Sequence, residues 1–163
     1  MNVSVPDADN SYIYAAAQEF KSRVEEYSNG SIELTIYPNG SLYGGDGNAA
    51  ISSVGNGSLD IVILASSCTP ASTQLLCGLR PLPVDDTKQL QDYLNSDIGK
   101  DLFNSVESMG ITCLGSWTRS FRQVTNSKKP INSPADLESM VLRTPSNSLY
   151  VEFFTACAPT PLP

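Results

Sequence analysis

The chain has 163 residues, of which 40% are hydrophobic and 17% are charged, a balance typical of a folded globular protein. It carries 17 acidic and 10 basic side chains, and the net charge of -7 argues against a nucleic-acid partner because no basic surface offsets the phosphate charge. It contains no histidine, which excludes Ser-His-Asp and Cys-His mechanisms and any histidine metal site.

The amino-terminal segment and the cysteines bear on the cellular compartment. No apolar run approaches the ~20 residues that span a membrane, and Met1–Val5 lacks the basic and apolar regions of a signal peptide. We therefore expect that an exported form has already lost its signal. The cysteines are Cys68, Cys77, Cys113 and Cys157, and without a CxxC pair we expect no zinc site. Cys68 and Cys77 either pair in an oxidising compartment or, like the other two, are small buried residues.

The first elements are predicted from short-range patterns. Residues 3–5 form a short β-branched segment typical of a strand. Apolar residues then recur every three or four positions from Ile13 to Tyr27, which predicts a helix. Residues 9–11 offer capping oxygens at its start, and Asn29-Gly30 favours its end. The alternation over residues 31–37 predicts a half-buried strand.

A glycine-rich loop and a buried strand follow. Residues 40–47 are rich in glycine but lack the spacing of a phosphate-binding loop, so we expect a surface loop. A short helix is predicted over residues 48–54. The continuous apolar run at residues 60–64 is typical of a parallel strand covered on both faces. Residues 65–83 are rich in Ser, Thr and Pro, which predicts loops with one short helix.

Two helices and a strand are predicted in the middle of the chain. Residues 85–95 and 97–109 have helical periodicity, and Gly110 is expected to cap the second helix. The apolar residues 111–114 predict another strand, and residues 117–125 an extended stretch.

The last third repeats the alternation of helix and strand. Ser133-Pro134-Ala135-Asp136 predicts the start of a short helix, and residues 140–142 predict a strand that ends in Arg143. A further helix carries aromatic residues between Tyr150 and Cys157 on a face expected to be core. Residues 159–163 resemble no closing element, so we expect the next strand to be missing and the chain to be truncated.

Regular alternation of helices and strands predicts an α/β fold with mostly parallel sheets. We expect an amino-terminal lobe over residues 1–116, and the hinge and beginning of a second lobe over residues 117–163. The pivot between the lobes is expected near residues 115–120.

Arg143 is the strongest candidate for a ligand contact. It ends an apolar strand, and the carboxyl ends of strands face the ligand crevice in open α/β sheets. Its planar guanidinium matches a carboxylate in a bidentate arrangement, although an interlobe salt bridge is an equal alternative. Ser66, Ser67 and Cys68 also follow a strand, but no histidine is available to serve as their base.

Several short motifs occur in order along the chain. They are Ala15–Phe20, Ser28–Ile32, Tyr37–Leu42, Gly57–Ile61, Phe121–Asn126, Leu142–Pro145 and Pro159–Pro161. Together they resemble the dicarboxylate-binding type of solute-binding protein from TRAP transporters.

The resemblance implies a type II periplasmic-binding-protein-like architecture of two α/β lobes, here incomplete at the carboxyl end. It implies a non-catalytic, periplasmic or extracytoplasmic protein, lipid-anchored or not, which needs no cofactor or metal. Its partners would be a small organic acid and ion-gradient-driven membrane subunits. By position, Arg143 would clamp the ligand carboxylate and Arg122 would assist. The remaining contacts implied are Ser66, Ser67, Ser11 or Tyr12, and Trp117 as a wall of the pocket or as a packing residue.

This sequence also departs from the family pattern. Ser139 and Val141 replace the usual Gly and Lys before Arg143, and about half of the family's length is absent. The open apolar faces would favour a homodimer with swapped elements. Two other functions stay open, namely a ligand-sensing input module on the same fold and a small enzyme that uses Cys68 or Ser66.

Overall fold

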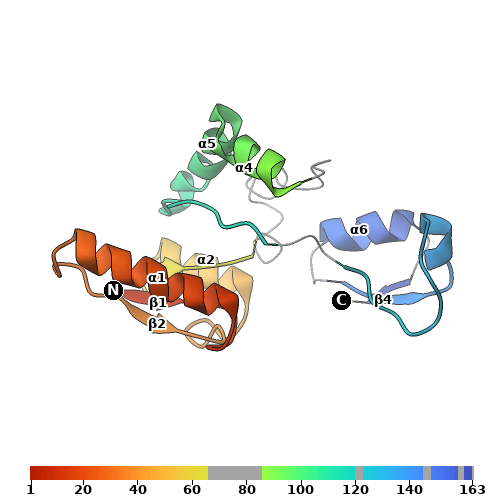
Figure 1. Ribbon diagram of the computed structural model, residues 1–163, viewed down its shortest axis with the longest axis horizontal. Helices are drawn as coiled ribbons and strands as arrows, with labels where there is room; N and C mark the ends of the chain where they lie inside the picture. Colours follow the sequence, from red (N-terminus) through yellow and green to blue (C-terminus); the bar gives the residue numbers. More distant parts are fainter. Residues whose placement is uncertain (66–85, 120–122, 145–147, 158–159, 163) are drawn as a thin grey trace. The chain divides into compact units, whose positions relative to one another are not determined.

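The computed structural model describes residues 1–65, 86–119, 123–144, 148–157 and 160–162 (Figure 1). The chain divides into two compact units. The first comprises Met1–Pro70 and Val106–Thr112, and the second comprises Ala71–Ser105 and Cys113–Pro163. The predicted lobe boundary between residues 116 and 117 stays a prediction. No helix in the described ranges has the length and apolar character needed to cross a bilayer.

The first unit is built on a three-stranded parallel sheet. Its strands are β1 (Asn2–Ser4), β2 (Thr35–Tyr37) and β3 (Ile61–Val62), in the order β2-β1-β3. Val3 at the centre of β1 pairs with Ile36 on one side and Ile61 on the other. The parallel sheet expected from the sequence is therefore present.

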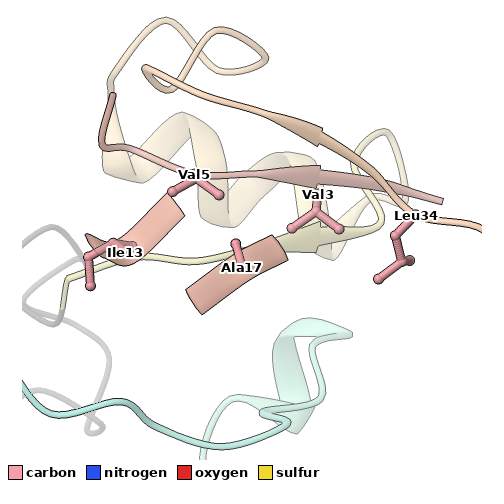
Figure 2. Close-up of a cluster of buried hydrophobic side chains, with 5 residues drawn as sticks. All are labelled: Val3, Val5, Ile13, Ala17 and Leu34. Atoms are coloured by element: carbon pink, nitrogen blue, oxygen red, sulfur yellow. The ribbon is translucent and has the colours of Figure 1, made fainter. Parts of the chain in front are cut away.

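Helix α1 (Tyr12–Tyr27) begins and ends where its local signals predict. The Ser11 side chain caps it by accepting a hydrogen bond from the Tyr14 N–H at 3.1 Å, and Asn29 and Gly30 follow it with positive φ values of 51° and 76°. Its apolar stripe packs against β1. Figure 2 shows the resulting cluster, which consists of Val3, Val5, Ile13, Ala17 and Leu34.

Helix α2 (Gly47–Gly55) covers the other face of the sheet. Asp46 caps it by accepting from the N–H groups of Asn48 and Ala49 at 2.7 and 3.3 Å. Residues 61 and 63 pack with the α1 cluster, whereas residues 62 and 64 pack with the cluster of Tyr43, Ala50 and Leu59. The apolar run at residues 60–64 is therefore covered on both faces, as predicted.

The predicted helix over residues 97–109 is interrupted, which corrects the expectation of one continuous helix. Helix α4 (Thr87–Asn95) leads into α5 (Asp97–Asn104), and a separate 3₁₀ turn, η2, spans Glu107–Met109. At Ser105 the hydroxyl donates to the Leu102 carbonyl at 2.6 Å. A serine hydroxyl that donates to a carbonyl of the preceding turn competes with the main-chain hydrogen bonds of the helix, and α5 ends just before Ser105.

The second unit contains a two-stranded parallel sheet. Its strands are β4 (Val141–Arg143) and β5 (Thr160–Leu162). Beside α4 and α5, this unit also contains η3 (Pro134–Leu137) and α6 (Ser148–Ala156). The expectation that residues 159–163 form no closing element is wrong, because Pro161 pairs with Leu142 in a parallel register. Proline lacks an N–H and is tolerated in edge strands, and both strands of a two-stranded sheet are edges.

Two further expectations need correction. Residues 111–114 form no strand, since they have no ladder partner among the described residues, and Leu114 is 70% exposed. The aromatic face of α6 is not wholly core either, because Phe153 is 52% exposed while its ring meets Phe154 edge to face. Both patterns were apolar enough for burial, but burial needs a neighbouring element that local sequence does not specify.

Candidate ligand-binding site

Arg143 is the last residue of β4, as the sequence predicts. Alternate residues of this strand point in opposite directions. Met140 and Thr144 are buried, at 8% and 1% exposure, whereas Val141 and Arg143 are exposed. The side chain of Arg143 therefore lies on the solvent-facing side of β4, at its carboxyl end.

A tight turn fixes the start of this strand. The Asp136 carboxylate accepts from the N–H groups of Asn132 and Ser133 at 3.0 and 2.9 Å, and from the Ser133 hydroxyl at 2.9 Å. These hydrogen bonds, with the Asn132 N–H as the largest contribution, lower the pKa of Asp136. Ser139 then turns the chain with a φ of 63°, and the Met140 N–H donates to the Leu137 carbonyl at 3.0 Å.

Arg143 takes part in no salt bridge between described residues. The four ion pairs found among the described residues all lie within helices α1, α4 and α5. Arg23, for comparison, donates to Glu19 at 2.7 Å on the exposed side of α1. The guanidinium of Arg143 is thus available to an anion from outside the described residues.

In the first unit, the amino terminus of α1 follows the carboxyl end of β1. The Ser11 Oγ already accepts from Tyr14, but its O–H can still donate to a ligand. Tyr12 is 66% exposed. Ser11 and Tyr12 therefore lie together at the edge of the sheet where ligands bind in open α/β folds.

Of the other predicted ligand contacts, Trp117 belongs to the described residues and three do not. Trp117 is 45% exposed, in a stretch without regular secondary structure. Arg122, Ser66 and Ser67 lie outside the described residues, as do Cys68 and Cys77. Cys113 and Cys157 are free and partly buried thiols.

An open hollow of about 340 Å³ near the start of β2 was not predicted from the sequence. Lys21 donates to the Leu34 carbonyl at 2.5 Å and lies 3.3 Å from Glu25, whose carboxylate accepts from the Leu34 N–H at 3.0 Å. The Leu34 N–H is the main reason why the pKa of Glu25 is lowered. Because these groups bond to one another, they hold the end of α1 on β2. The only signal in the sequence was the four-residue spacing of Lys21 and Glu25.

Each of the two units contains a parallel sheet, which is the α/β arrangement that the resemblance predicts. The family model described as bacterial extracellular solute-binding protein, family 7 (DctP), matches residues 3–163. The chain belongs to this family. Its members are solute-binding proteins rather than enzymes, so the non-catalytic assignment made from the sequence is confirmed.

Relatives with assigned ligands support the assignment. The chain is 29% identical to the 2,3-diketo-L-gulonate-binding periplasmic protein YiaO of Escherichia coli, over 92% of this chain and 45% of YiaO. It is also 29% identical to the C4-dicarboxylate-binding protein DctB of Bacillus subtilis, over 94% of this chain and 44% of DctB. The chain spans less than half the length of these curated relatives.

Solved structures confirm the fold. A TRAP periplasmic solute-binding protein from Ralstonia eutropha, with bound (S)-2-acetolactate, matches with a TM-score of 0.89 and 27% identity, over 99% of this chain and 52% of that one. A second, from Chromohalobacter salexigens with bound D-glucuronate, matches with a TM-score of 0.91 and 20% identity, over 99% and 54%. The predicted fold, a parallel α/β portion of the two-lobed architecture, is confirmed.

Proposed function

We propose that this chain captures a carboxylate-bearing small molecule for a TRAP-type transporter, and that Arg143 clamps the carboxylate. The observation that carries the proposal is the placement of Arg143. It stands at the carboxyl end of a parallel strand, exposed and in no salt bridge with a described residue. Thr144, the next residue, is buried at 1% exposure, so the carboxyl end of β4 is held by packing next to Arg143.

The chemistry of the guanidinium suits this role. A protein with a net charge of -7 repels anions at long range, so an acid-binding site must be locally positive. Arginine supplies this charge together with a planar fork that meets both carboxylate oxygens. Each charge-assisted hydrogen bond contributes about 1.5–3 kcal/mol.

The remaining predicted residues complete the site. Arg122 would provide a second guanidinium, and Ser66 and Ser67, which follow β3 in the sequence, would bond to ligand oxygens. The Ser11 hydroxyl would donate a hydrogen bond, and Tyr12 and Trp117, exposed by 66% and 45%, would cover the apolar face of the ligand. A hinge between the predicted lobes 1–116 and 117–163 would close around the ligand and exclude water.

The ligand class is inferred from the relatives of this chain. Two of them are named for binding 2,3-diketo-L-gulonate and C4-dicarboxylates, and related structures hold galacturonate and galactonate. We propose a sugar acid or another small organic acid, delivered outside the cytoplasm to ion-gradient-driven membrane subunits. Attachment of the protein to a lipid, and a homodimer with swapped elements, stay predictions.

The test compares Arg143→Lys with Arg23→Lys. Both variants keep the positive charge and lose the planar guanidinium, but Arg23 is paired with Glu19 on an exposed helix face. Calorimetric titration of the complete gene product with D-glucuronate, D-galacturonate and succinate should show binding that Arg143→Lys abolishes and Arg23→Lys preserves. Equal affinity of the two variants for a bound acid would refute the clamp.

A further inference from the structure

Two backbone segments of the first unit cross at a pair of glycines. Helix α2 ends at Gly55, and Gly110 follows η2 with a φ of 75°. A β-carbon on Gly55 would lie 2.7 Å from the Met109 carbonyl oxygen, and one on Gly110 would lie 3.1 Å from the Gly55 carbonyl oxygen. Because both obstacles are main-chain atoms, no side-chain rotation could relieve the contact.

Neighbouring side chains hold this crossing in place. Val106, just before η2, is 4% exposed, and two side-chain carbons of Ile111 lie 3.9 Å from the position of a Gly55 β-carbon. The segment Val106–Thr112 consequently belongs to the first unit, although the residues before and after it belong to the second.

Directly after this segment, the chain passes into the second unit and has no regular secondary structure. From Cys113 it belongs to the second unit, and residues 113–119 have no regular secondary structure. Leu114 is 70% exposed, and Gly115 has a φ of 152° with no heavy atom within 4 Å of the position that a β-carbon would take. The connecting segment is thus held on the first unit at Val106, Gly110 and Ile111, although residues 107–109 and Thr112 are exposed to solvent.

We propose that the Gly55–Gly110 crossing is the anchor of this connecting segment, and that both glycines are positioning residues for the ligand site. The crossing fixes residues 106–112 on the first unit, and Trp117 follows five residues later in the chain. The inference rests on the proposed function, since it assigns the crossing a role in bringing Trp117 to the ligand. A β-carbon at either glycine displaces Met109 or Gly110 and redirects the segment.

Two matched controls separate this role from general damage. Gly44→Ala carries the same backbone strain as Gly110→Ala, because Gly44 has a φ of 66°, but nothing lies within 4 Å of its β-carbon position. Gly40→Ala introduces contacts of 3.0 Å with the Tyr43 ring and 3.2 Å with the Gly45 main chain, at a φ of 59°. It therefore disturbs the first unit at least as much as the 2.7 Å contact of Gly55→Ala, but away from the connecting segment.

Trp117 is the single tryptophan of the chain and reports on the segment without any ligand. We would measure acrylamide quenching of its fluorescence, with circular dichroism confirming that each variant is folded. Gly55→Ala and Gly110→Ala should change the quenching constant by more than Gly40→Ala or Gly44→Ala does. If Gly55→Ala does not fold, the milder Gly110→Ala decides. Quenching constants for Gly55→Ala and Gly110→Ala equal to those of the two control variants would refute the proposal that the crossing anchors the segment.

Titration with D-glucuronate then separates this inference from the proposed function. Gly110→Ala should bind about tenfold more weakly than Gly44→Ala, which corresponds to about 1.4 kcal/mol. Equal affinity of these two variants would overturn the positioning role. A change in quenching, with none of D-glucuronate, D-galacturonate and succinate bound by any form, the parent chain included, would count against the proposed function and leave the anchor supported.

Discussion

Ser4 offers the sharpest test of the packing between the sheet and α2. It is the last residue of the central strand β1, fully buried at 0% exposure, and its hydroxyl has no hydrogen-bond partner among the described residues. Its neighbours Val3 and Val5 point into the α1 cluster, so strand alternation directs Ser4 toward the α2 side. Among the described residues, this hydroxyl is therefore shielded from solvent and makes no hydrogen bond.

Removing that hydroxyl should stabilise the fold. An unpaired buried polar group costs about 1–3 kcal/mol, and Ser4→Ala removes the group while leaving almost no cavity. We expect a gain of about 1 kcal/mol in the free energy of unfolding, or about 2–4 °C in the melting temperature for a protein of this size.

Urea denaturation measures this change, with an unchanged slope showing that the unfolded state is unaffected. Ser28→Ala is the matched control, because the Ser28 hydroxyl donates to the Glu25 carbonyl at 3.2 Å and accepts from the Ile32 N–H at 3.1 Å. That variant should lose about 0.5–1.5 kcal/mol. A loss of stability in Ser4→Ala as well would refute the reasoning, and would show that a buried water bonds to the hydroxyl.

Two further predictions concern the turn before β4. Ser139 has a φ of 63°, in the left-handed region that disfavours a β-carbon, so Ser139→Gly should stabilise the chain by about 0.5–1 kcal/mol in urea denaturation; a loss would contradict the strain. The pKa of Asp136 is lowered by hydrogen bonds from Asn132 and Ser133. The folded state therefore binds a proton at the Asp136 carboxylate less tightly than the unfolded state does. The stability that the ionised Asp136 contributes is fully present above the unfolded pKa and is lost as the pH falls through the folded pKa. Stability measured between pH 6 and pH 2 should consequently fall less steeply for Asp136→Asn than for the parent chain, and parallel curves would contradict the assignment.

The sequence predicted best those features whose signals are local. Ser11 and Asp46 supply capping oxygens just before their helices, and Asn29-Gly30 permits the backbone that ends α1. Arg143 at the end of an apolar run was predicted to end a strand and does so. In each case the decisive interaction is made within a few residues along the chain.

Features that depend on distant neighbours were missed. Residues 111–114 have the composition of a strand, but a strand also needs a partner on which to pair. Residues 159–163 were predicted to form no closing element, yet Pro161 pairs with Leu142 in an edge strand, where proline is tolerated. The contact between Gly55 and Gly110 joins positions 55 residues apart, and neither glycine looks unusual in its own segment.

The departure at position 141 sharpens the test of the clamp. On the exposed side of β4, Val141 takes the place where a lysine is usual in the family that the sequence resembles, so Arg143 is the only cation of this strand. Arg143→Lys leaves the charge of that face unchanged and removes the planar fork alone. An affinity that falls equally at low and high salt would assign the loss to bidentate geometry, because screening acts on the charge that both residues share. If Arg143→Lys instead bound the acid as tightly as the parent chain at both salt concentrations, the guanidinium would act as a point charge and the clamp would be refuted.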